Sequence, residues 1–171
     1  MAMSDDLSRI KKSAKELKGI AEESAARITE LNRFLSRNQP GIEVWGEDIC
    51  YERVTNCRDH AVDGWYQIGY GRSDEGKLAI VLKCVAQQTD ENGNLAYAAD
   101  QSGEKVSQDE TVWVRPLAAA PPELRIAAIS HLPDLMNKLA SACEAVTKKA
   151  KAEMDKFAAA SQELQDALRH K

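Results

Sequence analysis

Long apolar runs are absent from the sequence, and so is the pattern of a secretory signal. No stretch approaches the roughly 20 consecutive apolar residues that a helix needs to cross a bilayer. The first residues, Met1–Asp6, lack the basic segment followed by an apolar one that marks a signal peptide. We therefore expect a soluble, cytoplasmic protein that makes no contact with a membrane.

The sequence also has no excess of basic residues. Its 23 Lys and Arg are outnumbered by 27 Asp and Glu, which gives a formal net charge of −4 at pH 7. Proteins that hold nucleic acid mainly through its phosphates need clustered Lys and Arg. The lysines near both ends of the chain are interleaved with acidic residues, which is typical of solvated helix faces. We therefore expect no direct binding of nucleic acid.

The four cysteines, Cys50, Cys57, Cys84 and Cys143, are scattered without a repeated spacing. In a reducing compartment such residues are free thiols, so we expect no disulfide. Cys57 and His60 have the spacing of half a zinc site, and Cys50 lies nearby. Because no second pair completes a tetrahedral site, we interpret these residues as core or loop residues and expect no metal ion.

Catalytic motifs are equally scarce. The segment Arg58–His60 sets a carboxylate beside an imidazole, with Ser73 or Cys57 as a conceivable nucleophile. No strand-turn-helix elbow accompanies these residues, so a polar loop is the better interpretation. The glycines between residues 64 and 76 match neither a dinucleotide fingerprint nor a phosphate loop. We expect no catalytic residues and no cofactor, so an enzyme, including a metal-dependent one, is the least favoured class.

Two long segments at the ends of the chain carry apolar or small residues at steps of three and four, which aligns them on one helix face. The first segment is 4–37, and its mean step of about 3.5 residues is the heptad spacing of coiled coils. Its stripe consists of Leu7, Ile10, Ala14, Leu17, Ala21, Ser24, Ile28, Leu31 and Leu35. The second segment is 133–169, with a stripe of Leu135, Leu139, Cys143, Val146, Ala150, Met154, Phe157, Ser161, Leu164 and Leu168.

A helix over 4–37 would be roughly 50 Å long, so it needs a partner of similar length to bury its stripe. We therefore predict that the two long helices pair antiparallel within the chain, in the manner of a coiled coil. Ile20, Phe34 and Met136 form a surplus apolar edge beside the stripes. This edge predicts a homodimer through the long helices.

The middle of the chain, 41–115, is rich in β-branched and aromatic residues, with turn-forming residues between its apolar segments. We predict an antiparallel β-meander of four to six strands there. The expected strands are 42–45, 49–54, 65–70, 78–86, 95–98 and 111–114. A short helix is expected over 122–131, between prolines. The predicted fold class is therefore α+β, with residues 1–171 forming a single domain.

Aromatic residues make up 5% of the chain, and all of its Trp and Tyr fall in the predicted sheet region. Most are expected at the interface between sheet and helices. Trp65, Tyr66 and Tyr70 are the candidates for contact with a ligand or partner, because their strand alternates with Gln67 and Gly69.

Charge is unevenly distributed along the chain. Residues 38–120 carry fourteen Asp and Glu against seven Lys and Arg, whereas 1–37 and 121–171 are slightly basic. An acidic β head on a helical stalk favours a non-enzymatic interaction or adaptor protein that binds a basic protein surface. The alternative is a small-ligand module in which the aromatic sheet binds a nucleotide or metabolite. The sequence does not identify the protein partner.

Overall fold

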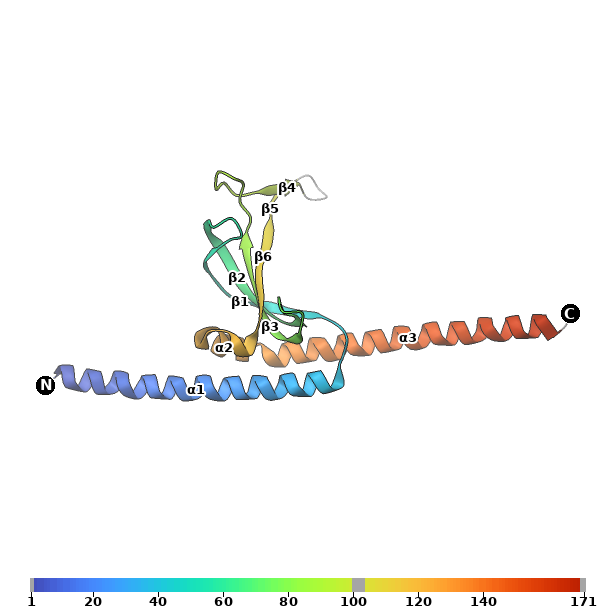
Figure 1. Ribbon diagram of the computed structural model, residues 1–171, viewed down its shortest axis with the longest axis horizontal. Coiled ribbons are helices and arrows are strands. Elements are labelled where there is room, and N and C mark those ends of the chain that lie inside the picture. Colours follow the sequence, from blue (N-terminus) through green and yellow to red (C-terminus); the bar gives the residue numbers. More distant parts are fainter. Residues whose placement is uncertain (1, 100–103, 170–171) are drawn as a thin grey trace.

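The computed structural model describes residues 2–99 and 104–169, with side chains from 9 to 99 and from 104 to 162. It shows an antiparallel sheet that stands on a layer of helices (Figure 1). The predicted α+β class and the antiparallel sheet in the middle of the chain are therefore confirmed.

The main sheet is a four-stranded meander in the order β1-β2-β3-β6, with every neighbouring pair antiparallel. Its strands are β1 (Val44–Thr55), β2 (Ala61–Arg72), β3 (Leu78–Gln87) and β6 (Asp109–Pro116). The short strands β4 (Tyr97–Ala99) and β5 (Lys105–Ser107) pair with each other in a separate sheet. The predicted segments 42–45 and 49–54 belong largely to one strand, because the irregularities around Asp48 disturb the alternation of β1 without ending it.

The two faces of the sheet have different surroundings. Side chains of β2 alternate between them, and the even-numbered residues from Val62 to Tyr70 are buried on the face that meets the helices. Ile68 joins Ile80 and Leu82 of β3 at the centre of the core, all with no exposed surface. The odd-numbered side chains lie on the opposite face, which we call the open face.

In the part of the chain that the structure describes, three α-helices form the layer beneath the sheet. They are α1 (Ala2–Asn38), α2 (Pro122–Ile129) and α3 (Leu132–Arg169), with the short 3₁₀ helix η1 (Leu117–Ala119) before α2. The predicted antiparallel pair of long helices is wrong. Instead α1 and α3 run in the same direction, and they lie side by side only where the last turns of α1 meet the first turns of α3 (Figure 1). Beyond this overlap they project from opposite ends of the molecule (Figure 1).

The connection between sheet and helices explains the difference. β6 ends at Pro116, and η1 and α2 then take the position on α1 that the prediction assigned to the C-terminal helix. Arg125 of α2 donates hydrogen bonds to the carbonyl oxygens of Ala120 and Ala21, at 2.5 and 3.4 Å. α3 begins after α2 and continues toward the C-terminal end of α1. Steps of three and four identify the apolar face of a helix, but they carry no information about the direction of its neighbour.

The buried part of the two stripes is the part next to the sheet and α2. In α1 it comprises Ala21, Ser24, Ile28 and Leu35, and in α3 it comprises Leu135 and Leu139. Asn32 also ties α1 to the sheet, because its Oδ1 accepts a hydrogen bond from the backbone N–H of Ile80 at 2.7 Å. The side chains of Leu7, Leu164 and Leu168, which the prediction placed on the stripes, lie outside the described residues.

Among residues 2–99 and 104–169, no helix combines the length and the apolar composition that a bilayer crossing requires.

Candidate interaction surfaces

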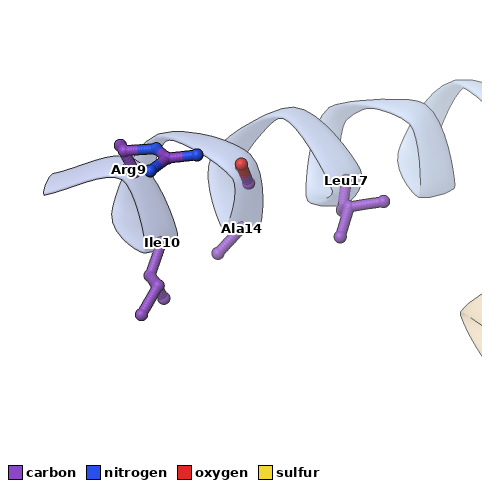
Figure 2. Close-up of a pocket in the computed structure, with 5 residues that line it drawn as sticks. Arg9, Ile10, Ala14 and Leu17 are labelled. Atoms are coloured by element: carbon purple, nitrogen blue, oxygen red, sulfur yellow. The ribbon is translucent and has the colours of Figure 1, made fainter. Parts of the chain in front are cut away.

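The first part of α1, residues 2–20, projects from the molecule, with Leu17 and Lys18 bordering α2 at its base, and we call it the N-terminal arm (Figure 1). Ile10, Ala14 and Leu17 point to one side of this arm, and Arg9 and Ser13 border the same shallow pocket (Figure 2). Ile10 is 64% exposed and Leu17 is 58% exposed. The apolar stripe that is buried at Ile28 therefore continues into solvent along the arm.

The last part of α3, residues 144–169, forms the corresponding C-terminal arm at the opposite end (Figure 1). Among its described side chains, which end at residue 162, the exposed large apolar ones are Val146, Met154 and Phe157, with exposed fractions between 52% and 69%. They continue the stripe that Leu135 and Leu139 begin in the core. A helix with one apolar face is stable in water chiefly when that face is covered, so both arms present surfaces suited to another protein.

A shallow apolar groove lies between the two arms, where α1 and α3 overlap. Its volume is about 470 Å³. Phe34, on its α1 side, is 61% exposed. The other lining residues are Leu31, Leu35, Asn38, Pro40, Met136, Leu139, Ala140 and Cys143. The sequence analysis placed Phe34, Met136 and Ile20 on a surplus apolar edge. Phe34 and Met136 line the same groove. Ile20 lies in the N-terminal arm instead and is 49% exposed.

Trp45 lies flat on the open face of the sheet, over two glycines of β2. A Cβ atom on Gly69 would come within 2.3 Å of the Trp45 ring, and one on Gly71 within 3.3 Å. The absence of side chains at these positions therefore makes room for the indole. The ammonium group of Lys83 lies 4.2 Å from the ring centroid, within cation–π range.

A second aromatic group on the open face consists of Tyr51 and Trp65, which are direct cross-strand partners in β1 and β2. Their ring centroids are 6.1 Å apart. The Tyr51 hydroxyl donates to Asp48 at 2.8 Å, and this bond to a carboxylate raises the pKa of the phenol. Asp63 lies on the same face, in an exposed ion pair with Arg53. The open face therefore combines aromatic rings with carboxylates.

The three residues that the sequence marked for ligand or partner contact do not lie together. Trp65 is on the open face, but Tyr66 and Tyr70 are buried on the helix side, with exposed fractions of 8% and 1%. The Tyr66 hydroxyl donates to Glu52 at 2.5 Å, and its ring lies 5.7 Å from that of Trp113. Because successive residues of a strand point to opposite faces, the alternation could have separated Trp65 from its neighbour. Tyr51 was missed, because its proximity to Trp65 depends on strand register.

The burial of Tyr66 and Cys84 predicts that the protein loses stability at alkaline pH. Burial raises the pKa of Tyr66 above its ordinary value near 10, and burial raises the pKa of the Cys84 thiol from 9 to about 11. In the unfolded chain these groups lose their protons at the lower values, so the free energy of unfolding falls as pH rises above 9. We expect Cys84 alone to account for a loss of about 2 kcal/mol between pH 9 and 11, and Tyr66 to add to it, as measured by urea denaturation. Cys84→Ala should flatten this slope; an unchanged slope would refute the assignment.

Of the residues considered for metal binding or catalysis, Cys57 and Arg58–His60 form the turn between β1 and β2, whereas Cys50 lies within β1. All four cysteines are free. Among the described residues, no group of three His, Cys, Asp or Glu side chains is placed to hold a metal ion. His60 Nδ1 lies 2.7 Å from Thr89 Oγ1, and the backbone N–H of Cys57 donates to Glu110 at 2.7 Å. Ser73 follows β2, whereas His60 precedes it, so the full length of the strand separates them.

Asn56 is the centre of this turn and was not singled out from the sequence. It is 3% exposed. Its amide nitrogen donates to Thr89 Oγ1 at 3.0 Å and to the Gln87 carbonyl oxygen at 3.3 Å. Its Oδ1 accepts from the backbone N–H groups of Arg58 and His60, both at 3.0 Å. One side chain thereby joins the β1–β2 turn to the end of β3.

Asn56→Ala is expected to lower the free energy of unfolding by about 2 kcal/mol, because buried donors and acceptors lose their partners. Chemical denaturation of the variant measures the change. Asn92→Ala, at an exposed loop position, serves as the matched control and should change stability by less than about 0.5 kcal/mol. Equal effects at the two positions would mean that Asn56 does not organise the turn.

Comparison of the chain with known protein families finds no matching family, and comparison with curated proteins and solved structures finds no significant match. The chain's own surfaces are therefore the basis for inferring its function.

Proposed function

We propose that the protein is a non-enzymatic adaptor whose β head binds a basic surface on a partner protein. The observation that carries the proposal is the Tyr51–Trp65 pair, which lies beside Asp48 and Asp63 on the face of the sheet away from the helices. Tyr51 is 73% exposed. Exposed aromatic rings next to carboxylates suit Arg and Lys side chains, which stack on the rings and pair with the acids.

Within its described residues, the head already contains two examples of this recognition. Lys83 lies over Trp45, and the guanidinium carbon of Arg115 lies 4.9 Å from the Trp113 ring centroid. Among the described side chains, no Lys or Arg lies over the Tyr51–Trp65 pair in this way. The surplus of acidic residues in 38–120 would also attract a basic partner over a longer range.

The alternative, a small-ligand module on the aromatic sheet, has less support. Of its three candidate residues, Tyr66 and Tyr70 are enclosed in the core between sheet and helices, and Trp65 alone is on the open face. A protein surface can use a shallow aromatic face, whereas a small ligand is usually bound in a concave site that buries most of it.

Titration with an arginine-rich peptide, followed by tryptophan fluorescence, tests the proposal. We expect saturable binding that weakens at least tenfold in Tyr51→Ala and in the double variant D48K/D63K. Tyr97→Ala, an exposed tyrosine on β4, is the matched control and should bind as the unaltered protein does. The proposal fails if the peptide does not bind, or if the head variants bind it as well as the control.

A further inference from the structure

We propose that the two arms bind a second copy of this chain, with the N-terminal arm of each protomer antiparallel to the C-terminal arm of its partner. This inference goes beyond the adaptor function and does not depend on it, because it concerns the helices and not the β head. It rests on the spacing, the charge and the placement of the arms.

The exposed stripes of the two arms have matching spacing. In the N-terminal arm the stripe positions are 10, 14 and 17, at steps of four and three. In the C-terminal arm, read backwards, they are 161, 157 and 154, at the same steps. Antiparallel pairing forms layers of Ile10 with Ser161, Ala14 with Phe157 and Leu17 with Met154. In the first two layers a large side chain meets a small one, which allows close packing of the helices.

Charge favours this register over a parallel one. Residues 8–18 of the N-terminal arm carry five Lys and Arg and one Glu. In the antiparallel register they lie opposite residues 153–163, which carry three acidic residues and one Lys. A parallel register also matches steps of four and three, with positions 150, 154 and 157 as partners. It sets 8–18 against 148–158, which carry four Lys and two acidic residues. The antiparallel register is therefore attractive, and the parallel one is repulsive.

The placement of the arms allows both pairs to form in one closed dimer. The arms project from opposite ends of the molecule (Figure 1), so a twofold rotation brings each arm to the other kind of arm at both ends. Such an isologous interface closes at two copies, whereas parallel head-to-tail pairing would continue into a filament. The groove that contains Phe34 lies between the arms and hence near the twofold axis.

The available apolar surface is sufficient for a modest interface. The large apolar side chains counted for the two arms are between 49% and 69% exposed: Ile10, Leu17, Ile20, Val146, Met154 and Phe157. At about 100 Å² per apolar side chain, their exposed parts in two copies sum to about 700 Å². With a non-polar share of about 60%, the interface would bury about 1,200 Å², the lower bound for stable complexes.

Light scattering coupled to size exclusion tests the proposal with charge-swap variants of the full chain. We expect the unaltered protein to have a mass of two chains at tens of micromolar. Leu17→Glu and Met154→Lys should each reduce it to one chain, and L17E/M154K should restore two chains, because the new charges face each other across protomers. Ala152→Lys, on the opposite side of the C-terminal arm, is the matched control and should leave the two-chain mass unchanged.

Circular dichroism verifies that each variant is folded, which is expected because the substituted side chains are exposed. The proposal is overturned by a one-chain mass of the unaltered protein at about 100 μM, or by a mass that grows steadily with concentration. It is also overturned if both single variants keep the two-chain mass, or if the folded double variant stays at one chain. None of these results bears on peptide binding by the head, so the two proposals fail separately.

Discussion

Gly64→Ala is expected to lower the free energy of unfolding by about 3 kcal/mol, at the upper end of the usual range for overpacking. A Cβ atom at this position of β2 would come within 2.3 Å of Val54 Cγ2 and within 2.7 Å of the Val85 carbonyl oxygen. The side chain of Val54 could rotate, but the carbonyl belongs to the backbone of β3. The sheet would therefore have to separate locally to accept one methyl group.

The matched control is the same substitution at Gly19 in the N-terminal arm. A Cβ atom there meets nothing within 4 Å, and alanine favours helix over glycine by about 1 kcal/mol. Gly19→Ala should therefore stabilise the protein slightly, while Gly64→Ala destabilises it. Urea denaturation of both variants measures the difference. Similar changes at the two positions would mean that β1, β2 and β3 are not packed as described.

The second large effect is expected for Leu135→Ala, at about 3 kcal/mol. Leu135 has no exposed surface and belongs to the core shared by α3, α1 and the sheet. Its removal would leave a cavity at the point where α3 is attached to the body of the protein. The same change at Leu17, which is 58% exposed, should cost less than about 1 kcal/mol.

Leu135 and Leu17 are a useful comparison because the sequence places each on the apolar stripe of a long helix, whereas the structure buries only Leu135. Denaturation is measured at a concentration where light scattering reports a single chain, so that association does not contribute. Comparable losses for Leu135→Ala and Leu17→Ala would show that Leu17 is buried within the chain. That result would contradict the exposed N-terminal arm.

The local features of the fold could be predicted from the sequence, and the relation between the long helices could not. Periodicity located α1 and α3, and alternation with turn residues located β2 and β3. The direction of α3 depends on η1 and α2, which bring the chain back to the middle of α1. The contacts that determine this direction, such as Arg125 with Ala21, join residues far apart in the sequence. No local pattern encodes such contacts.

The candidate surfaces could also be predicted only in part, because they too depend on contacts between residues far apart in the sequence. Trp65 could be recognised as a candidate because its residue type and strand were evident. The exposure of Tyr51 depended on the register between β1 and β2, and the central position of Asn56 depended on how the turn meets Thr89. The stripe residues of both arms were identified, but they were expected to be buried against each other. Their exposure follows from the direction of α3, which is the part of the prediction that failed.

The distance between residues 10 and 157 within one chain tests the central claim, that the long helices diverge, most directly. Spin labels are introduced at both positions through non-natural amino acids, which avoids the native cysteines, and the labelled chain is diluted into excess unlabelled protein. With Leu35 beside Leu139 and a rise of 1.5 Å per residue, the divergent helices predict a separation of roughly 60 Å. A separation below about 30 Å would contradict the account, because it requires the two helices to fold back on each other.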